Sequence, residues 1–254
     1  MTLTLTLRSQ PPWRVDASPL IPERLSGLDA GDVAAVDLRC GVEGIALGRL
    51  FHVSGAGDEQ LVLAGDLRRF DWIGARMSGG EIVVRGDVGA WAGAEMSGGV
   101  LRIFGDAGAR LGAAYPGARA GMTGGEIAVT GDAGEEAGAG MRRGLVAVGG
   151  QTGSGAGLRM LAGTVIALGG IGAEAGLGNR RGSLVSGRAL EPLPSYAYAA
   201  RYRPPALGLQ LRRARELGLP VDDALLRGTW ARWSGDRTEL SRGEILIFDE
   251  EEGL

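Results

Sequence analysis

The chain has 254 residues, of which 44% are hydrophobic and only 5% aromatic, and its formal net charge is −3. Arginine and acidic residues are interspersed, so the charge pattern gives no general attraction to nucleic acid or to a membrane surface. The single cysteine, Cys40, excludes an internal disulfide framework and a cysteine-ligated iron–sulfur cluster within this chain. All 27 basic residues are arginine, which also excludes a phosphate-loop lysine and a lysine Schiff base.

Neither a signal peptide nor a membrane span is predicted. The chain opens with alternating threonine and leucine over residues 2–7, which is typical of a strand. No apolar run approaches the roughly 18 residues that a membrane-spanning helix needs. We therefore expect a cytoplasmic protein.

Residues 1–59 are predicted to form an irregular amino-terminal cap that includes a first coil. After the opening strand, four prolines between positions 11 and 22 exclude a long helix. Residues 47–53 alternate again and lead into a glycine turn. His52 is the only histidine, so no site with several histidines can be built, and we interpret it as a structural residue.

Residues 60–188 repeat one short pattern, an apolar-x-apolar alternation that runs into glycines. Copies start at Glu81, Val100, Glu126, Leu145 and Thr164, which are 19, 26, 19 and 19 residues apart, and an earlier copy starts at Gln60. Alternation indicates a strand with one buried face, and glycines at fixed offsets indicate corners. One coil buries too few apolar side chains to offset the ordering of its backbone, so neighbouring coils must stack. The sequence therefore predicts an all-β fold, a right-handed parallel β-helix of about 19-residue coils.

Stacking converts repeated positions into columns. Two columns are apolar and a third contains five methionines, which we interpret as core rather than as a thioether metal site. The columns are Ile82, Leu101, Ile127, Val146 and Val165; Val84, Ile103, Val129, Val148 and Ala167; and Met77, Met96, Met122, Met141 and Met160, ending in Asn179. The asparagine suggests that the last coil lies near a solvated or capped end.

A fourth column is acidic and contains Asp66, Asp87, Asp106 and Asp132. Like charges one strand spacing apart repel unless their oxygens accept backbone N–H groups, as in an Asx-type turn. A calcium ladder is the alternative, although calcium-binding glycine-aspartate repeats have a period of nine residues. Residues 170–176 resemble a dinucleotide-binding glycine loop, but their third glycine is one residue late and no helix pattern follows.

Two features of the repeats are candidates for contacts with a partner. Extra residues from Tyr115 to Gly121 must leave the coil as a loop, and loops on a regular scaffold are common binding sites. Two arginine pairs share one column, with Arg159 near the column between them, which predicts a basic stripe that is either a solvated face or a docking site. The candidate partner-binding residues are Tyr115, Arg119, Arg142, Arg143, Arg180 and Arg181.

Residues 189–254 no longer repeat and are predicted to form a capping and partner-binding extension. Residues 207–217, which end at Gly218, form the one helix that we predict, with Leu207, Leu211 and Ala214 on one face. Residues 243–248 are predicted to form a final strand.

The glycine pattern of residues 86–99, the insertion that ends at Gly121-Met122 and the tail around 234–246 together resemble the C subunit of formylmethanofuran dehydrogenase and of the bacterial formyltransferase/hydrolase complex. The repeat region alone also resembles the carboxy-terminal domain of glutamate synthase large subunits. The first resemblance implies a β-helical subunit with no catalytic residue, metal or cofactor of its own. It implies three partner subunits, namely an amidohydrolase-like hydrolase, a formyltransferase and a further small subunit. A methanofuran-type or methylofuran-type carrier and zinc are expected in those partners.

The resemblance implies transfer of the formyl group from formyl-tetrahydromethanopterin to the carrier, and its hydrolysis to formate, in one-carbon metabolism of a methylotroph. Three other functions remain open at this point. The chain is alternatively the C subunit of a formylmethanofuran dehydrogenase, a separately encoded glutamate synthase-like domain, or a β-helical enzyme acting on polysaccharides. The last function fits poorly with the absence of a predicted signal peptide.

Overall fold

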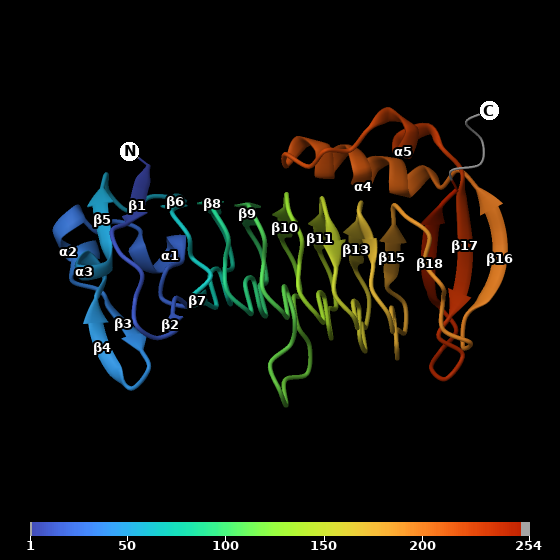
Figure 1. Cartoon of the computed structure of the whole chain (residues 1–254), viewed down its shortest axis with the longest axis horizontal. Helices are drawn as coiled ribbons and strands as arrows, with labels where there is room; N and C mark the ends of the chain where they lie inside the picture. The colour runs from blue at the N-terminus through green and yellow to red at the C-terminus, as the bar shows by residue number, and fades with distance from the viewer. Residues whose placement is uncertain (1, 250–254) are drawn as a thin grey trace.

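The computed structural model describes residues 2–249, which form an elongated body with the repeats in its middle and a cap at each end (Figure 1). Seven parallel strands from successive coils stack side by side along the long axis. They are β6 (Gln60–Ala64), β8 (Glu81–Arg85), β9 (Val100–Phe104), β10 (Glu126–Val129), β11 (Leu145–Val148), β13 (Thr164–Ala167) and β15 (Ser183–Ser186).

The register of these strands confirms both predicted apolar columns. Ile127 pairs with Leu101 on one side and with Val146 on the other, and Val129 pairs likewise with Ile103 and Val148. All of these side chains are buried in one continuous core, together with the five methionines of the third column. The alternation within each strand therefore places every second side chain in the shared interior.

A second, narrower line of parallel pairing runs along the coils after each glycine corner. It contains β12 (Gln151–Thr152) and β14 (Gly170–Ile171), and single bridges join Leu67, Val88, Ala107 and Ala133 in sequence to Thr152. These segments are short because glycines interrupt them, and each glycine leaves little room for a side chain beside the neighbouring coil.

The predicted all-β class is confirmed, and the main sheet is mixed and open. Its twelve strands follow the order β16-β17-β18-β15-β13-β11-β10-β9-β8-β6-β1-β5. At one end, β1 (Leu3–Leu7) is parallel to β6 and antiparallel to β5 (Phe51–Ser54). The opening strand therefore continues the sheet of the repeats and does not stand apart from it.

The rest of the amino-terminal segment surrounds this end of the sheet. A smaller four-stranded sheet joins β2 (Val15–Asp16), β3 (Asp37–Cys40), β4 (Glu43–Ala46) and β7 (Phe70–Asp71). Three short helices accompany it: α1 (Pro22–Leu25), α2 (Ala30–Ala34) and α3 (Leu47–Leu50). The prediction of alternating strand from residue 47 was wrong for 47–50, because Leu47 and Leu50 lie three residues apart and are both buried on one helical face.

The carboxy-terminal segment extends the sheet and covers part of its outer face. β18 (Gly243–Phe248) is parallel to β15, and β17 (Trp230–Gly235) and β16 (Ala197–Tyr202) follow as antiparallel strands. The predicted helix is confirmed as α4 (Pro205–Glu216), with the expected three residues buried, but it is not the only one, since α5 (Asp223–Arg227) follows and three short helices lie in the other cap.

The α4 helix packs on the outside of the later coils (Figure 1). In these coils the middle strand residue, which points away from the main core, is apolar; these residues are Ala128, Ala147, Ile166 and Val185. They form a second core with Leu207 and Leu211 of the helix. In an earlier coil the same position holds Arg102, which pairs with Glu81 at 2.8 Å. The outer face is therefore apolar where the helix covers it.

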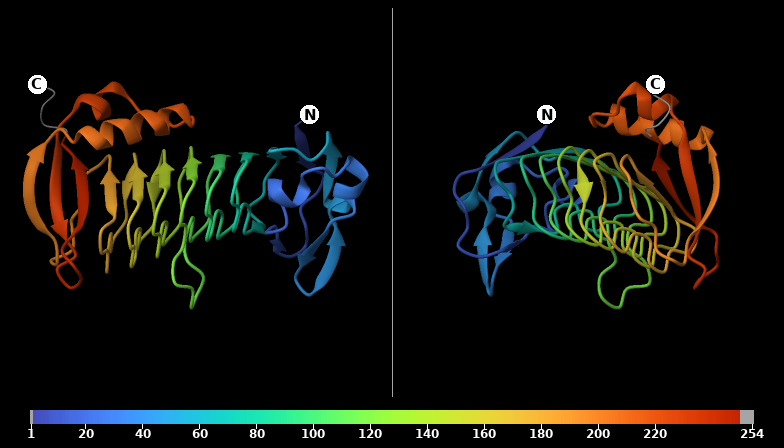
Figure 2. Two further views of the ribbon diagram at one scale, coloured as in Figure 1. Left: turned by 180° about the vertical axis from the view of Figure 1, so that it is seen from behind. Right: turned by 45° about the vertical axis from the view of Figure 1, so that its right-hand side comes forward.

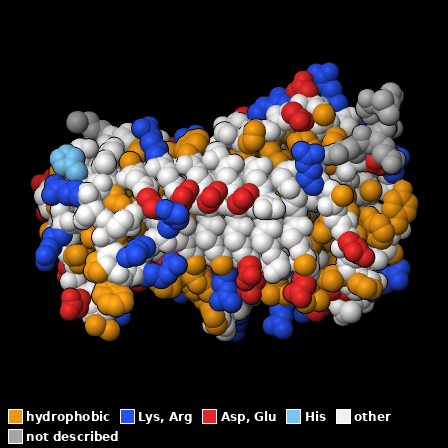
Figure 3. All heavy atoms as spheres, in the orientation of Figure 1, with side chains coloured by type: hydrophobic (Ala, Val, Ile, Leu, Met, Phe, Trp, Pro, Cys, Tyr) orange, Lys and Arg blue, Asp and Glu red, His pale blue; other side chains and the backbone are white. Residues whose placement is uncertain are grey.

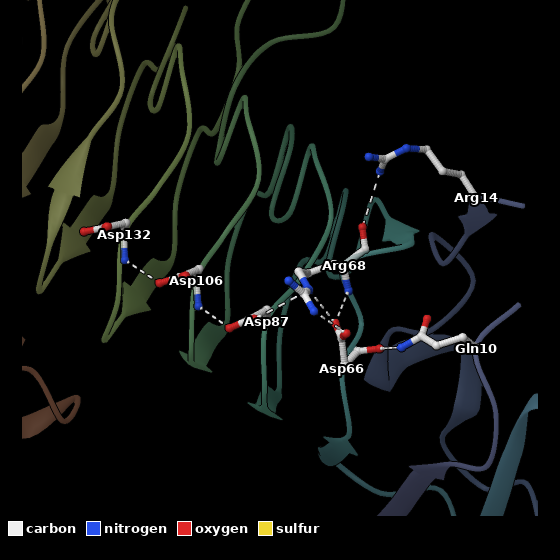
Figure 4. Close-up of polar contacts among 7 residues, drawn as sticks. All are labelled: Gln10, Arg14, Asp66, Arg68, Asp87, Asp106 and Asp132. Carbon is white, nitrogen blue, oxygen red and sulfur yellow. Dashed lines mark hydrogen bonds and ion pairs between the residues drawn. The ribbon is translucent and has the colours of Figure 1, made fainter.

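The acidic column crosses the glycine-rich face as a row of carboxylates (Figures 3 and 4). Asp87 Oδ1 accepts the backbone N–H of Asp106, Asp106 that of Asp132, and Asp132 that of Gln151, each at 2.8 Å. These bonds link one coil to the next, so the expected Asx-type turn is found only at Asp66, whose carboxylate accepts the N–H of Arg68 at 3.1 Å. Within residues 2–249 no group of three or more His, Cys, Asp or Glu side chains could hold a metal ion, so the calcium alternative has no support.

Candidate functional site

At one corner of the coils, residues with side chains occupy backbone positions whose positive φ angles favour glycine. Eight non-glycine residues with positive φ angles lie in two columns of this corner, and glycine fills the same columns in other coils, for example Gly155 and Gly140. The eight are Trp72, Trp91, Arg110, Glu136, Glu174, Arg76, Glu95 and Arg159. A positive φ costs a residue with a Cβ about 1 kcal/mol or more. The side chains retained at that cost make this corner a candidate functional surface.

Four of these corner residues and one loop residue form a connected cluster. The ring centroids of Trp91 and Tyr115 are 5.2 Å apart, and the guanidinium of Arg76 lies 5.0 Å from the Tyr115 ring centroid. Arg110 lies 4.8 Å from the Trp91 ring centroid. Arg76 also pairs with Glu95 at 3.0 Å. We call Arg76, Tyr115, Trp91 and Arg110 the corner stack, in which each neighbouring pair is an aromatic or cation–π contact.

The inserted loop, residues 114–121, leaves the coils at this corner, on the side that faces away from α4 (Figures 1 and 2). Its two ends bond to the following coil, since the N–H of Ala114 donates to Ala139 and that of Gly121 to Gly140. The loop separates two open grooves. The larger, which we call the loop groove, has a volume of about 940 Å³ and lies towards the carboxy-terminal cap. The smaller, about 580 Å³, lies towards the amino-terminal cap and contains Trp72 and Arg76.

The structure brings three of the six predicted site residues into the loop groove. Tyr115, Arg119 and Arg180 line it, whereas Arg142, Arg143 and Arg181 are exposed outside it. Tyr115 is half-buried, and burial raises its pKa to about 12. Arg180 pairs with Glu239 at 3.0 Å. The predicted basic stripe is therefore divided between the groove and the adjacent surface.

Sequence reasoning missed Trp91 and Arg110, which line the loop groove together with Arg159 of the predicted basic stripe. Their signal was present in the repeats, because each stands in a column where another coil has glycine. A later coil has Gly155 in the column of Trp91 and Arg110, and the preceding coil has Gly140 in the column of Arg159. Where one coil has glycine in a column, the coil can form without a side chain there, so a large side chain in the same column of another coil is not needed to form the coil.

The groove offers charged and aromatic surface. His52 lies in β5 in the amino-terminal cap, where its Nδ1 is 3.4 Å from a guanidinium nitrogen of Arg8. The carboxylates of the groove, Glu136 and Glu239, are each paired with an arginine. The arrangement suits recognition of an anionic surface, with arginine as the recognising group.

Comparison with known proteins identifies the family. No family model matches the chain. Over 86 residues the chain is 40% identical to the C subunit of the formyltransferase/hydrolase complex Fhc of Methylorubrum extorquens, an alignment that covers 34% of this chain and 32% of that protein. A solved structure, that of the formyltransferase/hydrolase complex FhcABCD from Methylorubrum extorquens with methylofuran, contains a chain that is similar over nearly the whole of this one. The similarity has a TM-score of 0.80 and 33% identity, and covers 96% of this chain and 98% of the matched one.

The chain belongs to the family of formyltransferase/hydrolase complex C subunits. The C subunit of the tungsten-containing formylmethanofuran dehydrogenase 2 of Methanothermobacter marburgensis is also related, at 32% identity over 91 residues, which is 34% of each chain. In sequence alignment, therefore, the chain matches about a third of the length of these curated relatives. Within residues 2–249, no helix of this family member has the length and apolar character of a membrane span.

Proposed function

We propose that this chain is a non-catalytic scaffold subunit of a formyltransferase/hydrolase complex. Its role there would be to hold the subunits that move a formyl group from formyl-tetrahydromethanopterin to a methanofuran-type carrier and hydrolyse it to formate. The observation that carries the proposal is the similarity over 96% of the chain to a subunit of such a complex. The paired carboxylates and remote histidine described above support a structural role for this chain itself.

The proposed partners are an amidohydrolase-like hydrolase, a formyltransferase and a further small subunit, with zinc and the furan carrier bound in those partners. Within this chain we assign residues 60–188 to a right-handed parallel β-helix. Residues 1–59 and 189–254 would be its amino-terminal cap and its partner-binding extension. The consecutive register of the seven repeat strands supports this division.

Activity measurements on separated and assembled subunits test the scaffold role. The purified chain alone is expected to show no formyl transfer and no hydrolysis of a formylated furan amine, whereas the complex that contains it shows both. Formyl transfer by the isolated chain, at a rate comparable with the complex, would contradict the proposal. The purified complex without this chain, assayed in parallel, shows how far its partners depend on it.

A second candidate is the dehydrogenase version of the complex, because the C subunit of a tungsten-containing formylmethanofuran dehydrogenase is also related. Metal analysis of the purified complex separates the two. The hydrolytic assembly is expected to contain no tungsten or molybdenum, and stoichiometric tungsten or molybdenum would favour the dehydrogenase.

The loop and the arginines are proposed as partner contacts, which a deletion tests. Removing residues 114–120 shortens the 26-residue coil to 19 and joins Ala113 to Gly121. Gly121 would then occupy the column of Glu95 and Arg159, whose φ angles are 54 and 51°, a conformation that glycine adopts freely. We expect an unchanged circular dichroism spectrum and a melting temperature within a few degrees of the parent, but weaker assembly of the complex.

A seven-residue glycine-serine replacement of residues 114–120 is the matched control, since it preserves loop length and removes the side chains. It is expected to weaken assembly as the deletion does. Normal assembly by both variants would show that the loop is not a partner contact.

A further inference from the structure

Tyr115 is committed to contacts within its own chain. Its ring contacts Trp91 and the guanidinium of Arg76, and its backbone N–H donates to Glu95 Oε1 at 3.4 Å. Glu95 is itself held by Arg76 at 3.0 Å. These contacts join the first residues of the loop to the two preceding coils, and they leave little of the ring for a partner.

The coil that carries the loop makes similar contacts through Arg110. Arg110 contacts the Trp91 ring and its Nε donates to Glu136 Oε2 at 2.9 Å. The backbone N–H of Trp91 donates to Ala109, and that of Arg110 to Glu135. The loop is therefore held in place before any partner arrives, which lowers the entropy cost of docking.

The loop groove has more positive than negative charge. Four arginines line it, Arg110, Arg119, Arg159 and Arg180, against two glutamates, Glu136 and Glu239. The glutamates pair with Arg110 and Arg180. Across residues 2–249 no ion pair is found for Arg119 or Arg159, and both are exposed. Subtracting two glutamates from four arginines leaves two positive charges, carried by Arg119 and Arg159, that no acidic side chain in the described part of the chain neutralises.

We propose that Tyr115 is a positioning residue that holds the inserted loop in a docking conformation, and that Arg119 and Arg159 bind carboxylates of an acidic segment of a partner subunit in the loop groove. This inference rests on the proposed function, because it requires a multi-subunit complex. Charge complementarity selects the occupant: two unpaired guanidinium groups facing one open groove match two carboxylates, and each arginine can bind a carboxylate through two parallel hydrogen bonds.

The positioning role is tested on the free chain with trypsin, which cleaves after arginine and therefore after Arg119 in the loop. Tyr115→Leu removes the ring that contacts Trp91 and Arg76, so we expect several-fold faster cleavage at Arg119. Tyr115→Phe keeps the ring, and among residues 2–249 no hydrogen bond of the Tyr115 hydroxyl is found, so its cleavage should match the parent. Equal cleavage rates for all three proteins would overturn the positioning role.

The docking role is tested by titrating the remaining subunits against this chain at several salt concentrations. For the double variant Arg119→Glu/Arg159→Glu we expect at least about tenfold weaker binding at low salt and a flatter salt dependence than for the parent, because the exposed charge pairs are lost. Arg39→Glu/Arg49→Glu, at two exposed arginines of the amino-terminal cap outside the groove, makes the same charge change and should bind like the parent.

The outcomes separate this inference from the proposed function. If the parent chain joins the formyl-transferring subunits and the double variant binds equally well at every salt concentration, the arginine contacts are wrong and the scaffold role stands. If the parent chain does not join those subunits at all, the proposed function itself fails. Tyr115→Leu should also weaken binding, and Tyr115→Phe should not.

Discussion

Val148→Asp is expected to prevent the chain from folding. Val148 is 0% exposed, at the centre of an apolar column between Val129 and Ala167. A carboxylate at this position would be buried without a partner, at a cost of several kcal/mol or more, against a total stability of about 5–15 kcal/mol for a typical domain. Because the coils share one core, the damage should spread to neighbouring repeats. Circular dichroism and solubility of the variant measure the result.

Two variants of the same coils serve as controls. Val148→Ala removes two methyl groups without adding charge and should fold with a loss of roughly 2 kcal/mol. Gln151→Asp adds a carboxylate to the exposed acidic column. Asp132, one coil earlier in this column, lies beside Gly150, and Gly169 is the equivalent glycine for residue 151. A new carboxylate there has room to accept a backbone N–H of the next coil, so the change in stability should stay within about 1 kcal/mol. A soluble, fully folded Val148→Asp protein would contradict the shared core.

Asp236→Ala is expected to lower the free energy of unfolding by roughly 2 to 3 kcal/mol. The Asp236 carboxylate is fully buried and accepts hydrogen bonds from the N–H groups of Gly178 and Thr238 and from the Thr238 hydroxyl, at 2.8 to 3.0 Å. It therefore ties the loop between β17 and β18 to the last coil. Its loss removes three hydrogen bonds to a charged acceptor, one from the partly buried Gly178 N–H and two from the exposed Thr238. Urea denaturation followed by the fluorescence of Trp230 and Trp233, both in this cap, measures the change.

The same residue predicts a pH dependence. Burial alone would raise the pKa of the Asp236 carboxyl, but the backbone N–H groups of Thr238 and Gly178 outweigh it and hold the pKa below its ordinary value. The folded chain thus binds this proton more weakly than the unfolded chain. The stabilisation is complete above the unfolded pKa of about 3.9 and is lost as the pH falls through the lower folded value.

Variants at Asp236 and Glu239 separate this contribution from general acid unfolding. Asp236→Asn should remove the corresponding part of the pH dependence. Glu239→Gln, which breaks the partly exposed pair with Arg180 in the same loop, should cost less than about 1 kcal/mol. Equal stabilities for Asp236→Ala and Glu239→Gln would show that the buried carboxylate does not anchor the cap.

The repeats were predictable because the same residue type recurs at the same position of several coils. The period alone determines the neighbours of Ile127 and Val129, and the register agrees. Asn179, which ends the methionine column, was expected near a solvated or capped end. It is fully buried, and its side-chain amide bonds to the backbone of Gly182. The caps were less predictable because their short helices, such as α3, depend on packing against segments distant in sequence.

The candidate site was predicted in part. The seven extra residues marked the loop, and with it Tyr115 and Arg119. Trp91 and Arg110 escaped notice because their columns are not obvious in the sequence until the positive φ angles show which positions favour glycine. The separation of Arg180 from Arg142 and Arg143 could not be predicted either, since it depends on Glu239 of the carboxy-terminal cap reaching Arg180.

Affinity purification of the tagged chain from the organism that encodes it, followed by mass spectrometry of its partners, tests the scaffold role most directly. We predict that a formyltransferase and an amidohydrolase-like subunit co-purify in stoichiometric amounts and that the assembly hydrolyses a formylated furan carrier. Recovery of the chain by itself, or with subunits that transfer ammonia, would contradict the account.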